Sequence, residues 1–293
     1  MKKYLAFDIG GTDLKYGILT NNFDIIYKNK VPTEALLGGM HIINNIIKIG
    51  KELLKTHIVV GVAVSSGGTI DWINGTVVSA SDSIPNFVGL ELKKLLEDAF
   101  KLPVSVENDV NCAALCENTL GVSKHAKNVA TLTIGTGIGG ALIFNNELYR
   151  GHAFSAGEWG YMNILGSRYE SIAATKALVE KSQVNIGSFI KNGIDVFSLY
   201  DNHDTKASIL VAEFYNNLSI GIANIIYCFN PEIVVLGGGI TSRPTFILEL
   251  MPYIEKNLNE YMLKNTRIVA AQFKNDAGLL GALVHHIRCF SIR

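Results

Sequence analysis

Two glycine-rich turns in the sequence carry residue types that bind anions. One turn spans Asp8–Thr12 (DIGGT) and the other spans Thr133–Gly140 (TIGTGIGG). Adjacent glycines let backbone N–H groups approach an anion closely, and a threonine hydroxyl adds a donor. A carboxylate beside a phosphate repels it unless a divalent cation or its water shell lies between them, so Asp8 predicts Mg²⁺ held directly or through water. Neither turn matches the usual glycine-rich nucleotide fingerprints.

A glycine-rich turn with a threonine occurs in both halves of the chain, which favours a pair of phosphate-binding turns around ATP. Alone, the first turn is equally a glycine hairpin with a solvated aspartate. A third glycine run ends the apolar stretch Val234–Ile240 and offers a flat surface for adenine. The predicted nucleotide contacts are Asp8, Gly10, Gly11, Thr12, Lys15, Gly135, Thr136, Gly137, Gly237 and Gly238.

Two acidic residues suit an alcohol acceptor. Asp109 follows an apolar strand at its junction with a helix, where a carboxylate lies at a sheet edge and can take the proton of a hydroxyl during phosphoryl transfer. The structural alternative is that Asn108 or Asp109 only caps the helix. Glu158 lies between Gly157 and Gly160 in an apolar setting, which predicts a buried carboxylate that accepts hydrogen bonds from sugar hydroxyls.

Period-2 alternation predicts two three-stranded antiparallel meanders, at 4–31 and 128–151, each with an Asn-Asn turn. Each meander precedes a helix (39–56; 206–230) and a buried strand (57–68; 231–240). The chain therefore reads as a duplicated βββαβα unit in an α/β fold. We predict one lobe at 1–115, a second at 116–275, and a terminal helix at 276–293 that packs back on the first.

Composition excludes several classes of protein. The 293 residues include 26 basic and 26 acidic side chains, so no bulk charge favours nucleic acid, and no low-complexity run indicates disorder. Asp8 interrupts the first apolar run too early for a signal peptide, and the later apolar segments have strand length; both favour a cytoplasmic protein without a membrane span. Cys112 and Cys116 are expected on a buried helix face, and His285 and His286 on a helix surface.

Five motifs resemble the ROK family of sugar kinases and repressors, in the order of that family and over essentially the whole chain: DIGGT, ENDVNCAALCE, TIGTGIGG, GEWGY and EIVVLGGGI. The resemblance implies the two-lobed actin-like ATPase fold, which is ribonuclease H-like, and it implies ATP with Mg²⁺. It also implies that Asp109 is the catalytic base. The residues that it implies for sugar binding are Gly68, Asn86, Asn108, Asp109, Glu158 and Glu170.

The chain departs from the family pattern at two places. Tyr161 stands where many members have histidine, and the following segment, 162–170, lacks their three zinc-binding cysteines, so we predict no zinc. Because the chain begins at its first strand, we expect no helix-turn-helix domain and no DNA binding. The resemblance suggests a homodimer, for which the apolar helix at 209–227 could supply an interface or simply core.

These features predict an ATP-dependent kinase that binds Mg·ATP between its lobes and phosphorylates a hexose-type sugar at the 6-hydroxyl. Loss of the histidine and the zinc segment alters the pocket near C1, which favours β-glucosides such as cellobiose and gentiobiose, although Tyr161 could instead close that side. N-acetylmannosamine kinase and glucokinase remain alternatives. A non-catalytic sugar sensor is a further alternative, but it would not need to retain Asp8, Asp109 and both glycine turns.

Overall fold

The computed structural model describes residues 1–290, and the chain divides into two compact units. Unit 1 comprises Met1–Leu120, Arg150–Ser155 and the chain from Asn275 onward, and unit 2 comprises Gly121–Tyr149 and Ala156–Lys274. The lobe boundaries expected from the sequence stay a prediction. The last three residues of the expected terminal helix, 291–293, lie outside the described residues.

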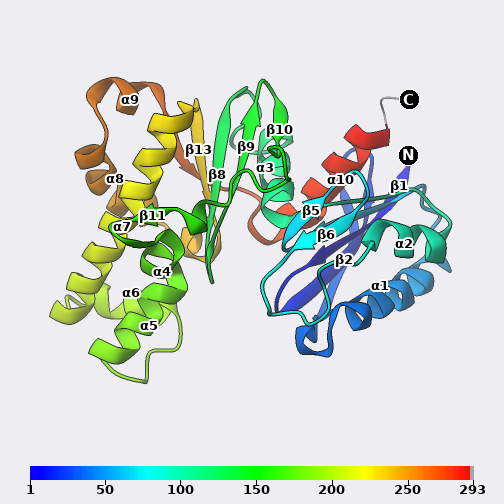
Figure 1. Cartoon of the computed structure of the whole chain (residues 1–293), viewed down its shortest axis with the longest axis horizontal. Helices are drawn as coiled ribbons and strands as arrows, with labels where there is room; N and C mark the ends of the chain where they lie inside the picture. The colour runs from blue at the N-terminus through cyan, green and yellow to red at the C-terminus, as the bar shows by residue number, and fades with distance from the viewer. Residues whose placement is uncertain (291–293) are drawn as a thin grey trace. The chain divides into compact units, whose positions relative to one another are not determined.

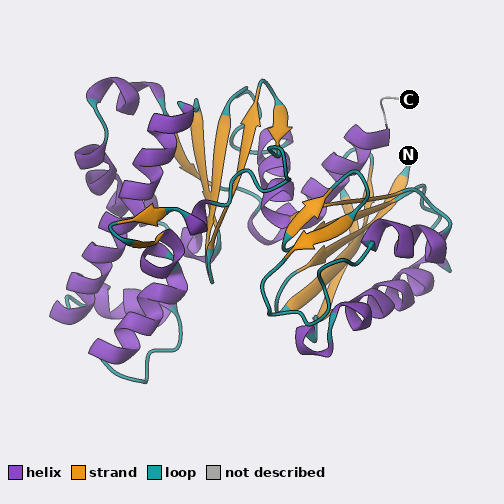
Figure 2. Ribbon diagram, in the orientation of Figure 1, coloured by secondary structure: helices purple, strands orange, loops and turns teal. Residues whose placement is uncertain are grey.

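Unit 1 contains a five-stranded sheet in the order β3-β2-β1-β4-β7 (Figures 1 and 2). Its strands are β1 (Lys3–Ile9), β2 (Asp13–Thr20), β3 (Ile25–Pro32), β4 (Val62–Ser66) and β7 (Val104–Asn108). The first three are antiparallel neighbours, which confirms the first predicted meander, whereas β4 runs parallel to β1 and β7. The carboxyl ends of β1, β4 and β7 therefore meet at one edge of the sheet.

The remaining elements of unit 1 pack around this sheet. The helices are α1 (Gly39–Leu54), α2 (Leu92–Phe100), α3 (Asp109–Thr119) and α10 (Ala277–Phe290), with the 3₁₀ turns η1 (Ala35–Leu37) and η4 (Lys274–Asp276) near them and a small hairpin formed by β5 (Thr69–Asp71) and β6 (Thr76–Ser79). Figure 1 shows α1 and α2 side by side. The α10 helix packs on α3, β1, β4 and β7.

The strands of unit 1 alternate between large apolar residues on one side and small or polar residues on the other, as the period of a strand requires. Leu5, Phe7, Val62 and Val64 belong to the core that also contains α1 and α2 residues. The intervening positions pack against α3 and α10, as the cluster of Ala63, Cys112 and Ala282 shows. These small side chains let the two helices approach closely, because a Cβ at Gly281 would collide with the backbone of Cys112.

The two histidines of α10 are buried, at 2% exposure each, so the prediction that they lie on a helix surface is wrong. His286 Nδ1 lies 3.1 Å from Ser105 Oγ, and its ring packs edge-on against Tyr4. His285 lies edge-on to Trp72. The physical reason is that the sheet face under α10 carries small residues. They leave room for the two imidazole rings between the helix and the sheet.

Burial of these rings predicts a loss of stability in acid. Burial lowers the pKa of both histidines to about 4. The positive charges of Arg150, Arg288 and Lys93 also lower the pKa of His285, whereas the negative charge of Glu107 raises it. Because an unfolded histidine titrates near 6.5, the unfolded chain binds more protons below that pH, and the free energy of unfolding should fall between pH 6.5 and pH 4. Urea unfolding at pH 7.0, 6.0 and 5.0 measures this free energy. The same urea midpoint at all three pH values would contradict the burial of neutral histidines.

Unit 2 repeats the topology of unit 1, with the sheet order β10-β9-β8-β13-β14. Its strands are β8 (Val129–Ile134), β9 (Ile138–Phe144), β10 (Glu147–Tyr149), β13 (Ile233–Gly237) and β14 (Arg267–Ala270). The second meander is confirmed, and both residues of its Asn145-Asn146 turn have a positive φ, as a type I′ hairpin requires. In both sheets the first strand lies third in order, so the predicted duplication is present.

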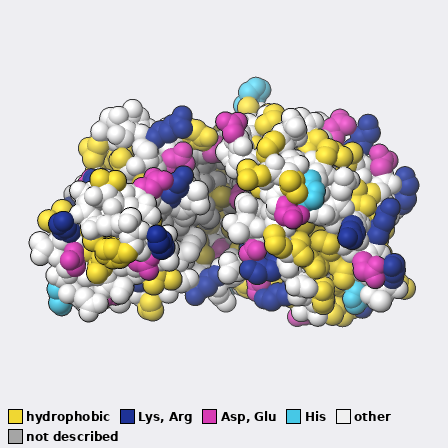
Figure 3. Space-filling view, turned by 90° about the horizontal axis from the view of Figure 1, so that it is seen from below, with side chains coloured by type: hydrophobic (Ala, Val, Ile, Leu, Met, Phe, Trp, Pro, Cys, Tyr) yellow, Lys and Arg dark blue, Asp and Glu magenta, His cyan; other side chains and the backbone are white. Residues whose placement is uncertain are grey.

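Helices make up most of the rest of unit 2. They are α4 (Tyr169–Ala173), α5 (Thr175–Asn185), α6 (Gly193–Asp201), α7 (Thr205–Phe229), α8 (Phe246–Asn257) and α9 (Glu260–Asn265), with the 3₁₀ turns η2 (Trp159–Tyr161) and η3 (Gly239–Ser242) and the two-stranded hairpin β11 (Asn163–Ile164) and β12 (Ser167–Arg168). Figure 3 shows acidic and basic side chains interspersed on the visible surface of the units, in keeping with the zero net charge.

The α7 helix is a core helix of unit 2. Among the described residues it is the one helix long and apolar enough to span a membrane by length and hydropathy, yet 67% of its apolar window is buried inside the protein. Ile209 and Tyr227, near its ends, are 62% and 45% exposed. The predicted homodimer stays a prediction, because burial of the middle of α7 is explained by the fold of unit 2.

Candidate functional site

The register of the unit 1 sheet gathers the predicted acidic residues at one edge. Asp8, Ser65 and Glu107 are paired across β1, β4 and β7, and Asn108 lies one residue further along β7. Asp109 then begins α3. Because the carboxyl ends of these parallel strands share an edge, residues from three distant segments lie together there.

Asn108 caps α3, which is the structural role considered for it from the sequence. Its Oδ1 accepts hydrogen bonds from the backbone N–H groups of Val110 and Asn111 at 2.9 and 3.0 Å. Its Nδ2 donates to the Gly68 carbonyl at 2.9 Å and to Asp109 Oδ1 at 3.1 Å. The cap thus ties the loop after β4 to the helix start and orients the half-buried Asp109 carboxylate.

A buried ion pair that the sequence reasoning missed lies directly behind these residues. Glu107 is fully buried, and its Oε1 accepts from the Asn108 backbone N–H at 2.8 Å and from Asn111 Nδ2 at 2.9 Å. Its Oε2 accepts from Arg150 Nε at 2.7 Å, and the Arg150 guanidinium lies 4.4 Å from the centre of the Trp72 ring. The motif ENDVN contained the glutamate, but no spacing signal links it to an arginine 43 residues later.

Asp8 is 7% exposed and already has two partners in unit 1. Ser65 Oγ donates to Asp8 Oδ1 at 2.7 Å, and Lys15 Nζ lies 3.2 Å from Asp8 Oδ2. A Cβ at Gly278 would collide with the carboxylate, so α10 presses closely against it. No cluster of three or more His, Cys, Asp or Glu side chains that could hold a metal occurs within residues 1–290.

This arrangement fits Mg²⁺ held chiefly by phosphate oxygens and water. Mg²⁺ usually keeps several waters and takes only one or two carboxylates beside substrate phosphates. Asp8 retains acceptor capacity beyond its two partners, because an ionised carboxylate has about four lone-pair sites. Lys15 balances the charge of Asp8 through its ion pair.

The other predicted unit 1 residues lie in turns. The Gly10 N–H donates to the Asp13 carbonyl at 3.1 Å and closes the turn that carries the exposed Gly11 and Thr12. Gly68 adopts a φ of +91° after β4, which a residue with a side chain rarely adopts. Asn86 is carried by the loop between β6 and α2, also with a positive φ, and its carbonyl oxygen lies beside Gly39 at the start of α1.

In unit 2, the second glycine turn lies beside one of the predicted sugar-binding glutamates. The Gly135 N–H donates to the Gly137 carbonyl at 3.0 Å and closes the turn between β8 and β9. A Cβ at Gly137 would lie 2.7 Å from Glu170 Oε2. Glu170 is held there by its neighbour Tyr169, which is fully buried and donates its hydroxyl hydrogen to the Leu218 carbonyl at 2.7 Å.

Glu158 is exposed rather than buried, so that part of the prediction is wrong. The adjacent Trp159 takes the buried position instead: its Nε1 donates to the Thr131 carbonyl at 3.1 Å, and its ring fills the space that a side chain at Gly140 would need. The anchored tryptophan therefore presents Glu158 at the surface. Partial desolvation by its surroundings, and then the charge of Glu170, raise the pKa of the Glu158 carboxyl.

Tyr161 ends the 3₁₀ turn η2, which Glu158 immediately precedes, and is 59% exposed. The Arg168 guanidinium carbon lies 4.8 Å from the centre of its ring. The segment between them is the short hairpin β11–β12, whose turn residues Leu165 and Gly166 both have a positive φ. This tight hairpin is the segment in which the sequence lacks the cysteine run.

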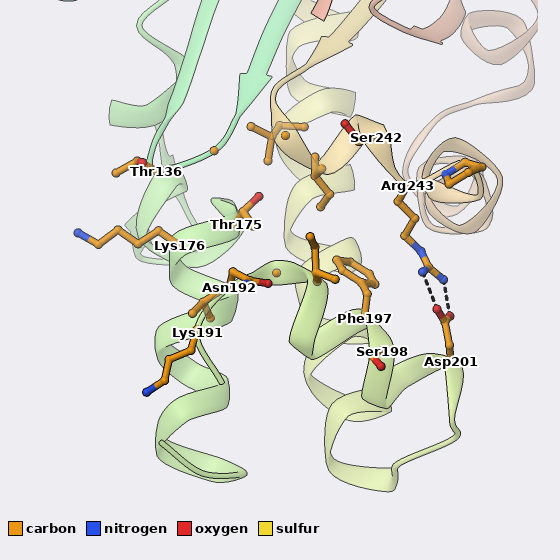
Figure 4. A pocket seen from close by; sticks show the side chains of 18 of the residues that line it. Thr136, Thr175, Lys176, Lys191, Asn192, Phe197, Ser198, Asp201, Ser242 and Arg243 are labelled. Atoms are coloured by element: carbon orange, nitrogen blue, oxygen red, sulfur yellow. Dashed lines mark hydrogen bonds and ion pairs between the residues drawn. The ribbon is translucent and has the colours of Figure 1, made fainter. Parts of the chain in front are cut away.

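A cavity of about 840 Å³ opens beside the second glycine turn, entirely within unit 2. Its lining includes residues of the β8–β9 turn, of α5, of α6 and of η3, among them Gly135, Thr136, Thr175, Asn192, Phe197, Gly239, Ile240 and Arg243. Figure 4 shows Thr175 and Phe197 directed toward the middle of the cavity, and Lys191 directed away from it. The size and the mostly apolar lining suit a ligand as large as a nucleoside.

The third glycine run contributes to this cavity through a different residue than predicted. Gly237 ends β13, and Gly238 packs against the backbone of Ile134, where a φ of +93° and the lack of a side chain are both required. Gly239 is the glycine of this run that lines the cavity. The close contact at Gly238 brings the β8–β9 turn and η3 together and so shapes the cavity mouth.

Arg243 closes one wall of the cavity. Its Nε donates to Glu249 Oε2 at 2.9 Å, and its guanidinium carbon lies 4.8 Å from the centre of the Phe197 ring. Its two Nη atoms donate to the Asp201 carboxylate at 2.9 and 2.6 Å (Figure 4). These hydrogen bonds lower the pKa of the Asp201 carboxyl. The sequence reasoning missed Phe197 and Arg243, since α6 carries no motif beyond its capping box at Asn192 and Asp195.

The chain matches one protein family over nearly its whole length. The model of the ROK family matches residues 4–287. The chain is 38% identical to a beta-glucoside kinase of Listeria monocytogenes, over 98% of each protein. It superposes with a TM-score of 0.88 on a ROK family protein from Streptococcus pneumoniae in complex with sucrose; the two are 28% identical, and the match covers 99% of this chain and 100% of that one. It superposes with a TM-score of 0.81 on a ROK family glucokinase from Streptomyces griseus in complex with glucose and AMPPNP; the two are 25% identical, and the match covers 96% of this chain and 97% of that one.

These matches confirm the predicted fold class, the actin-like fold of the ROK kinases. The beta-glucoside kinase and the glucokinase among these proteins are sugar kinases, which is the class of enzyme predicted from the sequence. With a family match across nearly the whole chain, the protein belongs to the ROK family.

Proposed function

We propose that this protein is an ATP-dependent sugar kinase that phosphorylates β-glucosides at the 6-hydroxyl. The observation that carries the proposal is the nucleoside-sized cavity beside the Gly135–Gly137 turn of unit 2. Asp109, at the sheet edge of unit 1, is the proposed base. The beta-glucoside kinases of Listeria monocytogenes and Klebsiella pneumoniae, at 38% and 33% identity, support the substrate class.

In the proposed nucleotide site, unit 2 holds the nucleoside in the cavity against Phe197 and Ile240, with the phosphates at the Gly135–Gly137 turn. The backbone N–H groups of Gly11 and Thr12 in unit 1 are the proposed further donors for phosphate oxygens. A bound Mg²⁺ would neutralise phosphate charge, and Asp8 would hold it through water. The neighbour from Streptomyces griseus, which carries AMPPNP, supports a nucleotide as the donor.

In the proposed reaction, Asp109 accepts the proton of the sugar 6-hydroxyl as its oxygen attacks the γ-phosphorus of ATP. The bond from that phosphorus to the bridging oxygen of ADP breaks, and ADP leaves. Asn108 fixes the carboxylate of Asp109 through the 3.1 Å hydrogen bond to Oδ1. Asn108, Gly68 and Asn86 in unit 1, and Glu158 and Glu170 in unit 2, are the proposed sugar contacts.

The proposal includes an acceptor that extends beyond one sugar ring. The neighbour from Streptococcus pneumoniae carries sucrose, a disaccharide, and so supports a pocket that admits a second ring. We also propose that the protein acts in the cytoplasm, where ATP is available.

A panel of sugars tests this function. ADP release is measured with glucose, N-acetylglucosamine, N-acetylmannosamine, cellobiose and gentiobiose at equal concentrations. We expect the two disaccharides to have the highest kcat/KM. Preference for glucose or for N-acetylmannosamine would replace the proposed substrate by a monosaccharide, and ADP release that no sugar stimulates would overturn the kinase function.

A further inference from the structure

The ring of Tyr161 is exposed although the residues around it are firmly anchored. Its neighbours Trp159 and Gly160 are buried, and the Met162 N–H donates to the Trp159 carbonyl at 2.9 Å, so the 3₁₀ turn is fixed. Tyr161 is nevertheless 59% exposed, and nearby Leu165 in the β11–β12 turn is 71% exposed. A rigid turn that presents large apolar surface to solvent is a common feature of ligand sites.

Arg168 holds the ring in one orientation. Its guanidinium stacks over one face of Tyr161 at 4.8 Å, and this position follows from the pairing of Arg168 with Asn163 in the β11–β12 hairpin. The positive φ values at Leu165 and Gly166 give the tight turn that sets this register. The guanidinium thus covers part of the ring, while 59% of the residue is open to solvent and to a stacking partner.

The Tyr161–Arg168 pair is connected to the two predicted sugar-binding glutamates. Arg168 Nη1 lies 3.9 Å from Glu170 Oε1, and a Cβ at Gly160 would lie 3.0 Å from Glu170 Oε2. The charge of Glu170 in turn acts on Glu158, which immediately precedes the turn. An aromatic ring, a guanidinium and two carboxylates therefore lie in one small region of unit 2, the composition expected where a carbohydrate is bound.

We propose that Tyr161 is the stacking platform for the second ring of the acceptor, the group attached at C1 of the glucosyl unit that is phosphorylated. The C–H face of a pyranose ring is apolar and packs on an aromatic face, while Arg168 can donate hydrogen bonds to its hydroxyls. This inference rests on the proposed sugar kinase function and identifies Tyr161 as the residue that selects β-glucosides over free glucose.

The test compares kcat/KM for cellobiose with kcat/KM for glucose in four proteins: the wild type, Tyr161→Ala, Tyr161→Phe and Tyr261→Ala. Loss of a stacked aromatic ring should lower the cellobiose-to-glucose ratio of Tyr161→Ala about tenfold. Tyr161→Phe keeps the ring and should keep the ratio. Tyr261, 71% exposed on α9, is the matched control for loss of a surface tyrosine, and its variant should behave as the wild type.

Two results would overturn the platform while leaving the kinase function in place. One is an unchanged ratio in Tyr161→Ala; the other is a ratio that rises, which would show that Tyr161 closes the C1 side. If the wild type phosphorylates no sugar, the proposed function fails separately, and calorimetric titration decides the platform. Cellobiose should then bind more weakly to Tyr161→Ala than to the wild type, and equal binding would contradict the inference.

Discussion

Replacing Asp109 by asparagine is expected to lower kcat for sugar phosphorylation by about a thousandfold, the range seen for loss of a positioned general base. Asparagine has the shape of aspartate, and its oxygen can still accept the hydrogen bond from the Val110 N–H, so the start of α3 should stay intact. Only the acceptor for the proton of the sugar hydroxyl is lost. Steady-state ADP release with cellobiose measures the change, and calorimetric titration with an ATP analogue checks that nucleotide affinity is retained.

Asp98→Asn is the matched control, because Asp98 is an exposed aspartate of α2 that lies 3.9 Å from the Nζ of Lys101, a long contact. Its kcat should equal that of the wild type. Full activity in Asp109→Asn would show that Asp109 is not the base, and weakened nucleotide binding with unchanged kcat would show instead that it acts on ATP.

Replacing Glu107 by alanine is expected to lower the free energy of unfolding of unit 1 by about 3–5 kcal/mol, as removal of one partner of a buried ion pair does. The change leaves the Arg150 guanidinium, whose side chain is 17% exposed, without its carboxylate. It also removes the acceptor for the Asn108 N–H and for Asn111 Nδ2. Urea unfolding followed by tryptophan fluorescence, with Trp72 beside Arg150 as a local probe, measures the loss.

An exposed pair in the same unit supplies the control. Lys30 and Asp13 lie 2.8 Å apart with side chains 64% and 32% exposed, so Asp13→Ala should cost at most about 1 kcal/mol. A double variant with methionine at both Glu107 and Arg150 should regain much of the stability, because it leaves no buried charge unpaired. A loss in Glu107→Ala no larger than that in Asp13→Ala would contradict the account of the buried pair.

The features that the sequence predicted are those with local signals. Strand alternation specifies both meanders, because side chains of a strand alternate with period 2. In the second meander the Asn145-Asn146 turn adds a local signal, since both residues adopt the positive φ that a type I′ hairpin needs. The glycine turns are similarly local, since each is closed by hydrogen bonds within a few residues, such as Gly10 to Asp13. The family resemblance then extended these segments to the whole fold.

The features that escaped prediction depend on packing between distant segments. His285 and His286 lie on an apolar helix with no pattern that marks them as inside, and only the small residues of β4 and β7 beneath them make room. Glu158 was expected to be buried because glycines flank it, but Trp159 takes the buried place. Phe197 and Arg243 meet across 46 residues, so no spacing rule marks them as one wall of a cavity.

The central claim, phosphoryl transfer from ATP to the 6-hydroxyl of a β-glucoside, is tested most directly by identifying the product. The protein is incubated with Mg·ATP and cellobiose, and the phosphorylated sugar is examined by phosphorus–proton correlation NMR. We predict a single phosphate ester on C6 of the non-reducing glucosyl unit, formed in equal amount to ADP. Formation of ADP without a sugar phosphate would contradict the claim. Phosphorylation of free glucose but not of cellobiose would contradict it as well.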